Sequence, residues 1–265
     1  MTLDFPTSLG TSDAEHIHLL GQDVAGDLMG RVGFGELAFW LITRRRPTSG
    51  EARLFEAVLI GLADHGFTPT AIAARLTYLS APDAVQGALA AGLLGGGSRF
   101  LGVTEDTGRF LAEVLAAAPE LPRSEEAWDA LARTAVTTRK AAGKFVPGLG
   151  HPVHKQQDPR TPKLIEIAHA EDLYGPHLAL FEAIGRVHPE ILGKTLPLNG
   201  AGVSGAALAD LGLPHELLRA AVLLARCAGL IGHIAEEMTR PVANSIYLTV
   251  DRNARYVEPD SPTIP

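Results

Sequence analysis

The sequence has little cysteine, few aromatic residues and no excess of positive charge. Its single cysteine, Cys227, excludes an internal disulfide and any zinc site built from several cysteines. The formal net charge of -7 argues against a nucleic-acid surface and leaves no polybasic membrane anchor. The N-terminus lacks the basic-then-apolar order of a signal peptide, and Arg, His or Gly interrupts the longest apolar runs. We therefore expect a cytoplasmic protein that binds neither nucleic acid nor membrane.

The apolar content is nevertheless high. Apolar residues make up 46% of the chain but aromatic residues only 6%, so Ala, Leu, Ile and Val build the core, which suits close helix packing. The 265 residues suffice for one large domain or for a large and a small one. Period-2 runs of β-branched residues are absent except at Ser245–Val250, where we expect a short strand or an extended arm. The pattern predicts an all-α protein.

One stretch, Lys144–Arg160, which we call the histidine loop, lies between two helix-like segments. Gly148 and Gly150 permit backbone conformations closed to other residues and close approach to a ligand, while three prolines stiffen the remainder. His151 and His154 add groups that bind and transfer protons. This composition indicates a functional site. The alternative is a helix–helix connector whose histidines are merely polar.

The histidine loop also carries a family resemblance. Gly-Leu-Gly-His-Pro-Val-His-Lys followed by Asp-Pro-Arg resembles the G-x-G-H-x-V-x-K-x-x-D-P-R motif of citrate synthases, citryl-CoA lyases and the citrate-cleaving part of ATP-citrate lyase. The resemblance implies that His151 is catalytic and that Arg160 binds a substrate carboxylate. The residues that it implies for contact with coenzyme A are Gly148, Leu149, Gly150 and Lys155.

A long apolar segment from His215 to Met238 is predicted to be a buried helix. Arg226, His233 and Arg240 follow one another at intervals of seven residues, which places them near one line. A buried arginine keeps its charge, so it needs an anionic partner. That partner is either a carboxylate of the same segment, such as Glu236, or a ligand. The residues alone leave open a structural ion-pair network and a binding site.

This segment also resembles the family. Its Ala-Arg-x-x-Gly-x-Ile-x-His followed by Arg-Pro is similar to the substrate-arginine segment of citrate synthases. The resemblance implies that Arg226 and Arg240 bind carboxylates, with Arg240 supplied across a dimer interface. With Arg160 they offer three guanidinium groups, which suit a di- or tricarboxylate. His65 matches the family histidine that polarises the substrate carbonyl or tertiary alcohol, although a histidine at a helix end is more often structural.

Two positions depart from the synthase pattern. Phe100 falls where synthases carry a second catalytic histidine, and Arg99-Phe100 resembles the lyase part of ATP-citrate lyase. Ala201 falls where the family carries the aspartate that moves a proton at the acetyl carbon, a function worth about 10²–10⁴-fold in rate. Three explanations are open. Another group replaces the aspartate, the substrate needs no proton transfer at this carbon, or the protein binds an acyl-CoA without turning it over. The candidate replacements are His154, His233 and Glu236, and Arg99 is a further accessory residue.

The resemblance runs from about Ile17 to Pro241. It implies an all-α, citrate synthase-like fold with a large helical domain, residues 1–138 and 220–265, and a small domain, residues 139–219. It also implies coenzyme A as part of a thioester substrate or product, no metal, and a homodimer or larger homo-oligomer. The leading interpretation is a citryl-CoA lyase-type enzyme that cleaves citryl-CoA, or a related 3-hydroxyacyl-CoA, and releases acetyl-CoA and oxaloacetate. The alternatives are a CoA-thioester-binding or regulatory homologue and a citrate synthase-type condensation.

Overall fold

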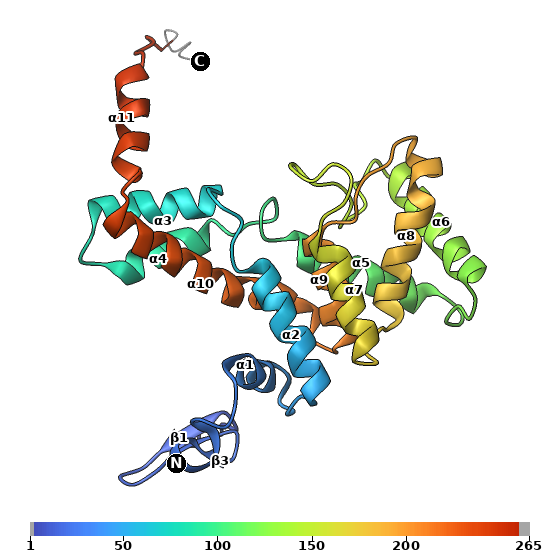
Figure 1. The fold of residues 1–265 in the computed structure, drawn as a ribbon, viewed down its shortest axis with the longest axis horizontal. Coiled ribbons are helices and arrows are strands. Elements are labelled where there is room, and N and C mark those ends of the chain that lie inside the picture. Colours follow the sequence, from blue (N-terminus) through green and yellow to red (C-terminus); the bar gives the residue numbers. More distant parts are fainter. Residues whose placement is uncertain (1–2, 260–265) are drawn as a thin grey trace. The chain divides into compact units, whose positions relative to one another are not determined.

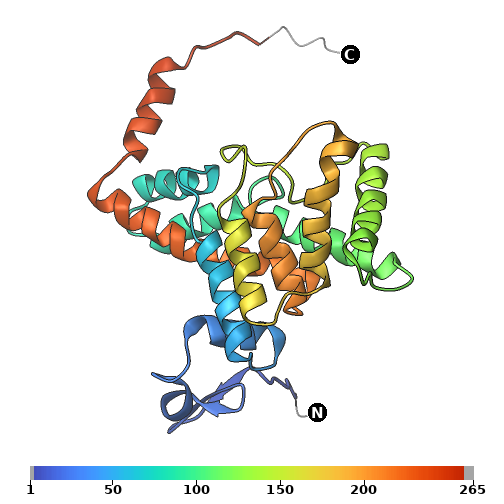
Figure 2. The same cartoon turned by 45° about the vertical axis from the view of Figure 1, so that its right-hand side comes forward.

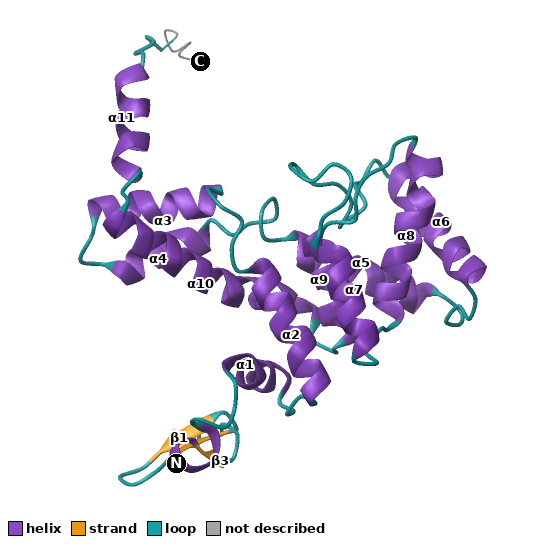
Figure 3. Ribbon diagram, viewed as in Figure 1, coloured by secondary structure: helices purple, strands orange, loops and turns teal. Residues whose placement is uncertain are grey.

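The computed structural model describes residues 3–259, and these are predominantly helical (Figures 1 and 3). They form two compact units. The first contains the residues up to Ala63 together with Ser98–Ala225, and the second contains Asp64–Gly97 and the residues from Arg226 onward. The predicted all-α class is confirmed. The predicted small domain, residues 139–219, lies wholly within the first unit, and its boundaries stay a prediction.

The first unit consists of helices around one apolar core. Its helices are α1 (Phe34–Thr43), α2 (Ser49–Leu62), α5 (Val103–Ala117), α6 (Glu125–Ala141), α7 (Arg160–Ala170), α8 (Pro176–Leu192) and α9 (Gly200–Asp210). Helix α9 packs against α5 and α8, and α8 also packs against α6. Phe39, Phe55 and Phe181 are fully buried among aliphatic side chains. Helix α9, which is rich in small residues, is therefore the centre of this unit.

Two glycines allow the close contacts that place the histidine loop. A Cβ atom at Gly205 would collide with the backbone of Thr104, so α9 lies directly against α5. Gly148 has φ +82°, and a Cβ atom there would lie 2.5 Å from the ring of Phe181 on α8. Only glycine meets both requirements at residue 148. The loop is thus held against the core immediately before His151.

The first unit begins with a small antiparallel sheet (Figure 3). Its strands are β1 (Gly10–Ser12), β2 (Ile17–Leu19) and β3 (Gln22–Asp23), and the π-helical turn η1 (Val24–Leu28) follows. Thr11 lies opposite His18 in the first pairing, and His18 lies opposite Asp23 in the second. Strands of two or three residues are too short to produce a period-2 pattern, which explains why the sequence analysis does not find them.

The second unit is smaller. Its helices are α3 (Pro69–Ser80), α4 (Val85–Leu94), α11 (Ala243–Asn253) and the part of α10 (Leu218–Thr239) that begins at Arg226. The 3₁₀ turn η2 (His215–Leu217) and the first residues of α10 belong to the first unit. Leu230 and Ile234 of α10 pack with Ala71, Ala74 and Ala88 to form the core of the second unit. Helix α3 packs against both α4 and α11.

The prediction of a short strand or an extended arm at Ser245–Val250 is wrong, because these residues lie in α11. Oε1 of Glu237 accepts hydrogen bonds from the N–H groups of Val242 and Ala243, at 2.9 Å and 2.8 Å, and so satisfies donors at the start of the helix. This cap and the contact with α3 override the β-branched pattern. Both views show α11 turning away from α10 (Figures 1 and 2).

One segment of the described residues, His215–Thr239, is long and apolar enough to cross a membrane by length and composition alone, because its most apolar 18 residues have a mean hydropathy of 1.6. The expectation that Arg, His or Gly interrupts the longest apolar runs before they reach the length of a membrane span is therefore wrong for this segment. Leu230 and Ile234, which the segment contains, fill the core of the second unit. Only 39% of that window is buried, and Ile231 and Met238 of the helix are exposed, so the predicted burial holds for part of the helix and not for all its faces.

Candidate active site

The histidine loop pairs with the chain just before α9. The N–H of Gly150 donates to the carbonyl of Pro197 at 2.8 Å, and the N–H of Asn199 donates to the carbonyl of Gly148 at 2.9 Å. The side-chain amide of Asn199 donates to the carbonyl of Gly150 at 2.7 Å, while its oxygen accepts from the N–H of Gly202 at 2.8 Å and caps α9. The loop and the first turn of α9 are therefore one connected piece.

Asp158 is the centre of this piece and is completely buried. Its Oδ1 accepts from the backbone N–H and from Nε of Arg160, at 3.1 Å and 3.0 Å. Its Oδ2 accepts from Nη2 of Arg160 and from the N–H of Gly200, both at 2.7 Å. Burial by itself raises the pKa of Asp158, but these hydrogen bonds and the guanidinium charge lower that pKa far below its ordinary value. Asp158 is thus a fixed negative charge that joins Arg160 to the first residue of α9.

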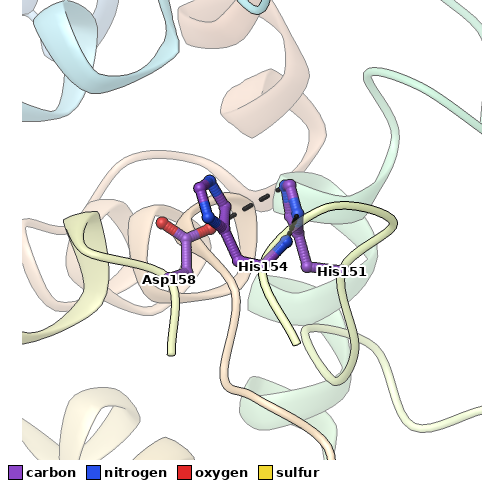
Figure 4. A group of neighbouring side chains, drawn as sticks. All are labelled: His151, His154 and Asp158. Atoms are coloured by element: carbon purple, nitrogen blue, oxygen red, sulfur yellow. Dashed lines mark hydrogen bonds and ion pairs between the residues drawn. The ribbon is translucent and has the colours of Figure 1, made fainter. Parts of the chain in front are cut away.

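His151 lies beside Asp158 (Figure 4). Its Nδ1 accepts hydrogen bonds from the N–H groups of Val153 and His154, at 3.1 Å and 3.0 Å, so a neutral ring carries its proton on Nε2. Nε2 lies 4.0 Å from Oδ2 of Asp158, and the ring centroid lies 4.5 Å from that of His154. The ring can therefore act as a donor through Nε2. This fits the catalytic role expected of His151, which stays a prediction.

The two imidazoles and the carboxylate in Figure 4 could hold a metal ion by distance alone, because their ligand atoms lie within 4.8 Å of one another. Their hydrogen bonds do not suit a cation. A metal on Nε2 of His151 would require the proton on Nδ1, which already faces two N–H donors. Asp158 is also paired with the guanidinium of Arg160. These contacts support the expectation of no metal, which stays a prediction.

Arg160, which is expected to bind a substrate carboxylate, is held by the protein. Two of its side-chain N–H groups donate to Asp158, and a third, on Nη1, donates to the carbonyl of Gly61 at 3.0 Å. A guanidinium carries five N–H groups, so two remain for a ligand. Its side chain is 23% exposed, which gives a ligand access. Arg160 can therefore be fixed by Asp158 and still bind an anion.

A cavity of about 700 Å³ opens beside Gly148, Leu149 and Gly150, three of the residues expected to contact coenzyme A. Three cationic side chains, Arg109, Arg139 and Lys144, line it together with two acidic ones, Asp106 and Glu113, which leaves an excess of one positive charge. Arg109 and Arg139 lie on amphipathic helices, where single cations are usually solvated, and Lys144 lies in the histidine loop but outside its motif, so the sequence gives no reason to select them. Lys155, the fourth residue expected to contact coenzyme A, is exposed, and its Nζ donates to the carbonyl of His151 at 3.3 Å. Arg99 is also exposed.

The remaining predicted residues lie in the second unit. His65 and Arg240 are exposed there, whereas Arg226 is only 5% exposed. The first unit brings His151, His154 and Arg160 together, and the second brings the turn of His65 together with His233. A single site that contains both groups stays a prediction.

An ion network in the second unit engages His233. Arg75 is fully buried and donates from Nε to Nδ1 of His233 at 3.0 Å and from Nη1 to Oε2 of Glu237 at 2.8 Å. It also pairs with Glu236, and Nε2 of His233 lies 2.9 Å from Oδ1 of Asp64. The structural network that the sequence left open therefore exists, but its arginine is Arg75. Both ring nitrogens of His233 are occupied, so a role as the replacement acid requires one of these bonds to break.

Ala201, where the family resemblance implies a carboxylate, lies half-buried in the first turn of α9. Among residues 3–259, no hydrogen bond reaches the ring nitrogens of His154, whose backbone N–H donates to His151. Glu236 is paired with Arg75. Of the three candidate replacements, His154 is the one next to His151 with its ring available.

Comparisons with known proteins identify the family of the chain. Residues 14–247 match the family described as citrate synthase, C-terminal domain. The chain belongs to the citrate synthase family, which confirms the expected membership and fold.

Its structure is similar to that of citryl-CoA lyase from Hydrogenobacter thermophilus, with a TM-score of 0.83 and 29% identity over 98% of this chain and 97% of that one. An aspartate-to-alanine variant of Methanosaeta concilii ATP citrate lyase, in complex with (3S)-citryl-CoA, shares the fold with a TM-score of 0.76 and 22% identity over 98% of this chain and 42% of that one. The citrate synthase of Deinococcus radiodurans is 27% identical over 90% of this chain. The chain spans about three fifths, 61%, of the length of that curated relative.

Proposed function

We propose that the protein is a citryl-CoA lyase-type enzyme that cleaves citryl-CoA into acetyl-CoA and oxaloacetate, or a related 3-hydroxyacyl-CoA into acetyl-CoA and the corresponding carbonyl compound. The observation that carries the proposal is the similarity to the Hydrogenobacter thermophilus citryl-CoA lyase, at 29% identity and along 97% of that chain. The match to the Deinococcus radiodurans citrate synthase is less identical, at 27%, and covers 61% of its length. Coverage therefore favours a lyase over a synthase.

In the proposed reaction a base takes the proton of the tertiary hydroxyl and a retro-aldol step breaks the neighbouring carbon–carbon bond. The alcohol carbon becomes the keto carbon of oxaloacetate, and the electron pair moves to the thioester as an enolate. His65 binds the developing carbonyl oxygen, and His151 donates a hydrogen bond or a proton from Nε2. Protonation of the enol carbon then gives acetyl-CoA, and this is the step for which Ala201 offers no group.

Three arginines bind the carboxylates of the substrate in this proposal: Arg160, Arg226 and Arg240. Exposed Arg240 reaches the site of a second subunit, so the proposal includes a homodimer. The thioester lies along Gly148–Gly150, and the phosphates of coenzyme A bind the cationic residues of the adjacent cavity. A volume of about 700 Å³ is of the size that ligand pockets have.

Ala201 favours a second candidate function, a protein that binds a CoA thioester without turning it over. The Methanosaeta concilii protein that holds (3S)-citryl-CoA carries an aspartate-to-alanine substitution, so this fold can hold the intact thioester. A citrate synthase-type condensation stays a third candidate. It is tested in the same preparation by adding acetyl-CoA and oxaloacetate and measuring the free thiol that forms.

The deciding experiment mixes the purified protein with citryl-CoA and follows oxaloacetate through a coupled dehydrogenase. We expect release of oxaloacetate, and we expect His151→Ala to lower kcat by at least about 10²-fold, because the Nε2 donor is lost. Lys163→Ala is the matched control, since its side chain is 62% exposed and pairs with the exposed Glu166.

Calorimetry with coenzyme A separates the candidates. Tight binding without oxaloacetate release supports the binding protein, and release that survives His151→Ala contradicts the assigned role of His151. A panel of other 3-hydroxyacyl-CoA thioesters then identifies the preferred acyl group. Failure to bind coenzyme A or any of these thioesters contradicts both the lyase and the binding protein.

A further inference from the structure

The turn that carries His65 is fixed by the side chain of the preceding residue. Oδ2 of Asp64 accepts a hydrogen bond from the N–H of Gly66 at 2.8 Å, and the carboxylate also accepts one from the N–H of His65. Burial raises the pKa of Asp64, but the hydrogen bonds from Gly66, His65 and His233 lower it by more, so the pKa is below its ordinary value. The carboxylate is therefore ionised. The Asp64 side chain is 48% exposed, so burial alone does not immobilise it.

His233 supplies the contact that holds Asp64. Its Nε2 lies 2.9 Å from Oδ1 of Asp64, while its Nδ1 accepts from Nε of Arg75 at 3.0 Å. Arginine has no acceptor, so Nδ1 must be unprotonated and the ring proton sits on Nε2, directed at Asp64. A second ring proton would lie on Nδ1, where it would face the N–H that Nε of Arg75 donates. The ring is therefore a bridge between a cation and an anion.

Arg75 is immobilised on several sides. It is fully buried, its Nη1 donates to Oε2 of Glu237 at 2.8 Å, and its guanidinium lies 5.0 Å from the ring centroid of Phe67. That ring also lies 5.7 Å from the ring of His233. The other oxygen of Glu237 caps α11. The bridge is thus anchored in the core of the second unit and ends at the exposed turn of His65.

We propose that Arg75 and His233 are positioning residues that hold Asp64 and, through it, the backbone of His65. The functional part of this inference rests on the proposed role of His65 in the lyase reaction. A side chain that binds a developing carbonyl must stay close to its productive position, and a displacement of 1 Å can cost about 10²-fold in rate. An exposed turn does not provide that precision by itself. The relay from Arg75 provides it without contact with the substrate.

Two substitutions of His233 that differ by one methylene test the relay. His233→Gln can accept from Arg75 and still donate to Asp64, whereas His233→Asn reaches Arg75 but not Asp64. Both keep a partner for buried Arg75, so both are expected to fold. We expect His233→Asn to lower kcat for citryl-CoA by about 10-fold to 10²-fold and His233→Gln to retain most of it. Met238→Leu, an exposed position on the same helix, is the matched control.

Amide exchange at His65 and Gly66, measured by NMR, tests the relay without reference to activity. We expect His233→Asn to speed exchange at both amides and His233→Gln to leave it unchanged. Unchanged exchange in His233→Asn overturns the proposal. Equal loss of kcat in both variants, with both amides still protected, assigns a proton-transfer role to His233 and also overturns it. If the wild-type protein does not cleave citryl-CoA, the proposed function fails while the exchange result still decides whether the relay exists.

Discussion

Ala201→Asp is expected to raise the rate of oxaloacetate release from citryl-CoA by about 10²-fold or more. The substitution restores a carboxylate in the first turn of α9, the turn that is joined to the histidine loop through Asn199. A negative charge near a helix N-terminus is also favourable by about 0.3–1 kcal/mol, so the variant is expected to fold. The measurement is kcat in the coupled oxaloacetate assay.

One control shows whether the charge or the shape of the new side chain matters. Ala201→Asn has the shape of aspartate without its ionisable group, and equal effects of the two substitutions would contradict the argument.

His154→Asn tests the histidine whose ring is available beside His151. If His154 replaces the carboxylate, its substitution lowers the wild-type rate, and the double variant with Ala201→Asp recovers it. No effect of either single substitution would indicate a substrate that needs no proton at this carbon.

Asp158→Asn is expected to destabilise the protein by about 3 kcal/mol, because it removes one partner of a buried ion pair. The new amide would place an N–H₂ group where Oδ2 now accepts from Arg160 and Gly200. Urea denaturation measures the loss. Asp129→Asn is the matched control, since Asp129 is 26% exposed and pairs with a more exposed Arg186, and its loss is expected to cost less than about 1 kcal/mol. Equal costs for the two substitutions would show that burial of Asp158 does not matter.

The same residue predicts how stability changes with pH. The pKa of Asp158 is lower in the folded protein than its ordinary value of about 3.9. Its contribution to stability is therefore complete above about pH 4 and is lost as the pH falls toward the folded-state pKa. We expect the free energy of unfolding to fall less steeply below pH 4 in Asp158→Asn than in the wild type. Parallel curves would contradict this assignment.

The histidine loop could be predicted because its chemistry is local in the sequence. Gly148 and Gly150 both have positive φ, as expected of glycines at forced conformations. The fold class followed from helical periods and from the near absence of strand patterns. The strand expected at Ser245–Val250 failed because the competing cap comes from Glu237, a side chain on the preceding helix.

Contacts between distant residues could not be predicted. Asp158 appears in the sequence as part of a motif, and nothing local shows that it is buried or bonded to Gly200. Arg75 and His233 are 158 positions apart, and only the packing of α3 against α10 brings them together. The sequence therefore selects His233 but assigns it a role that its two bonded nitrogens oppose.

The shared hydrogen bonds of Gly148, Gly150 and Asn199 mean that the loop and the start of α9 open or close together. A ligand that binds to Gly148 and Gly150 would therefore restrain Asn199 and the first turn of α9 without contacting them. Binding of a ligand to the histidine loop would therefore reduce the mobility of the helix backbone at Ala201.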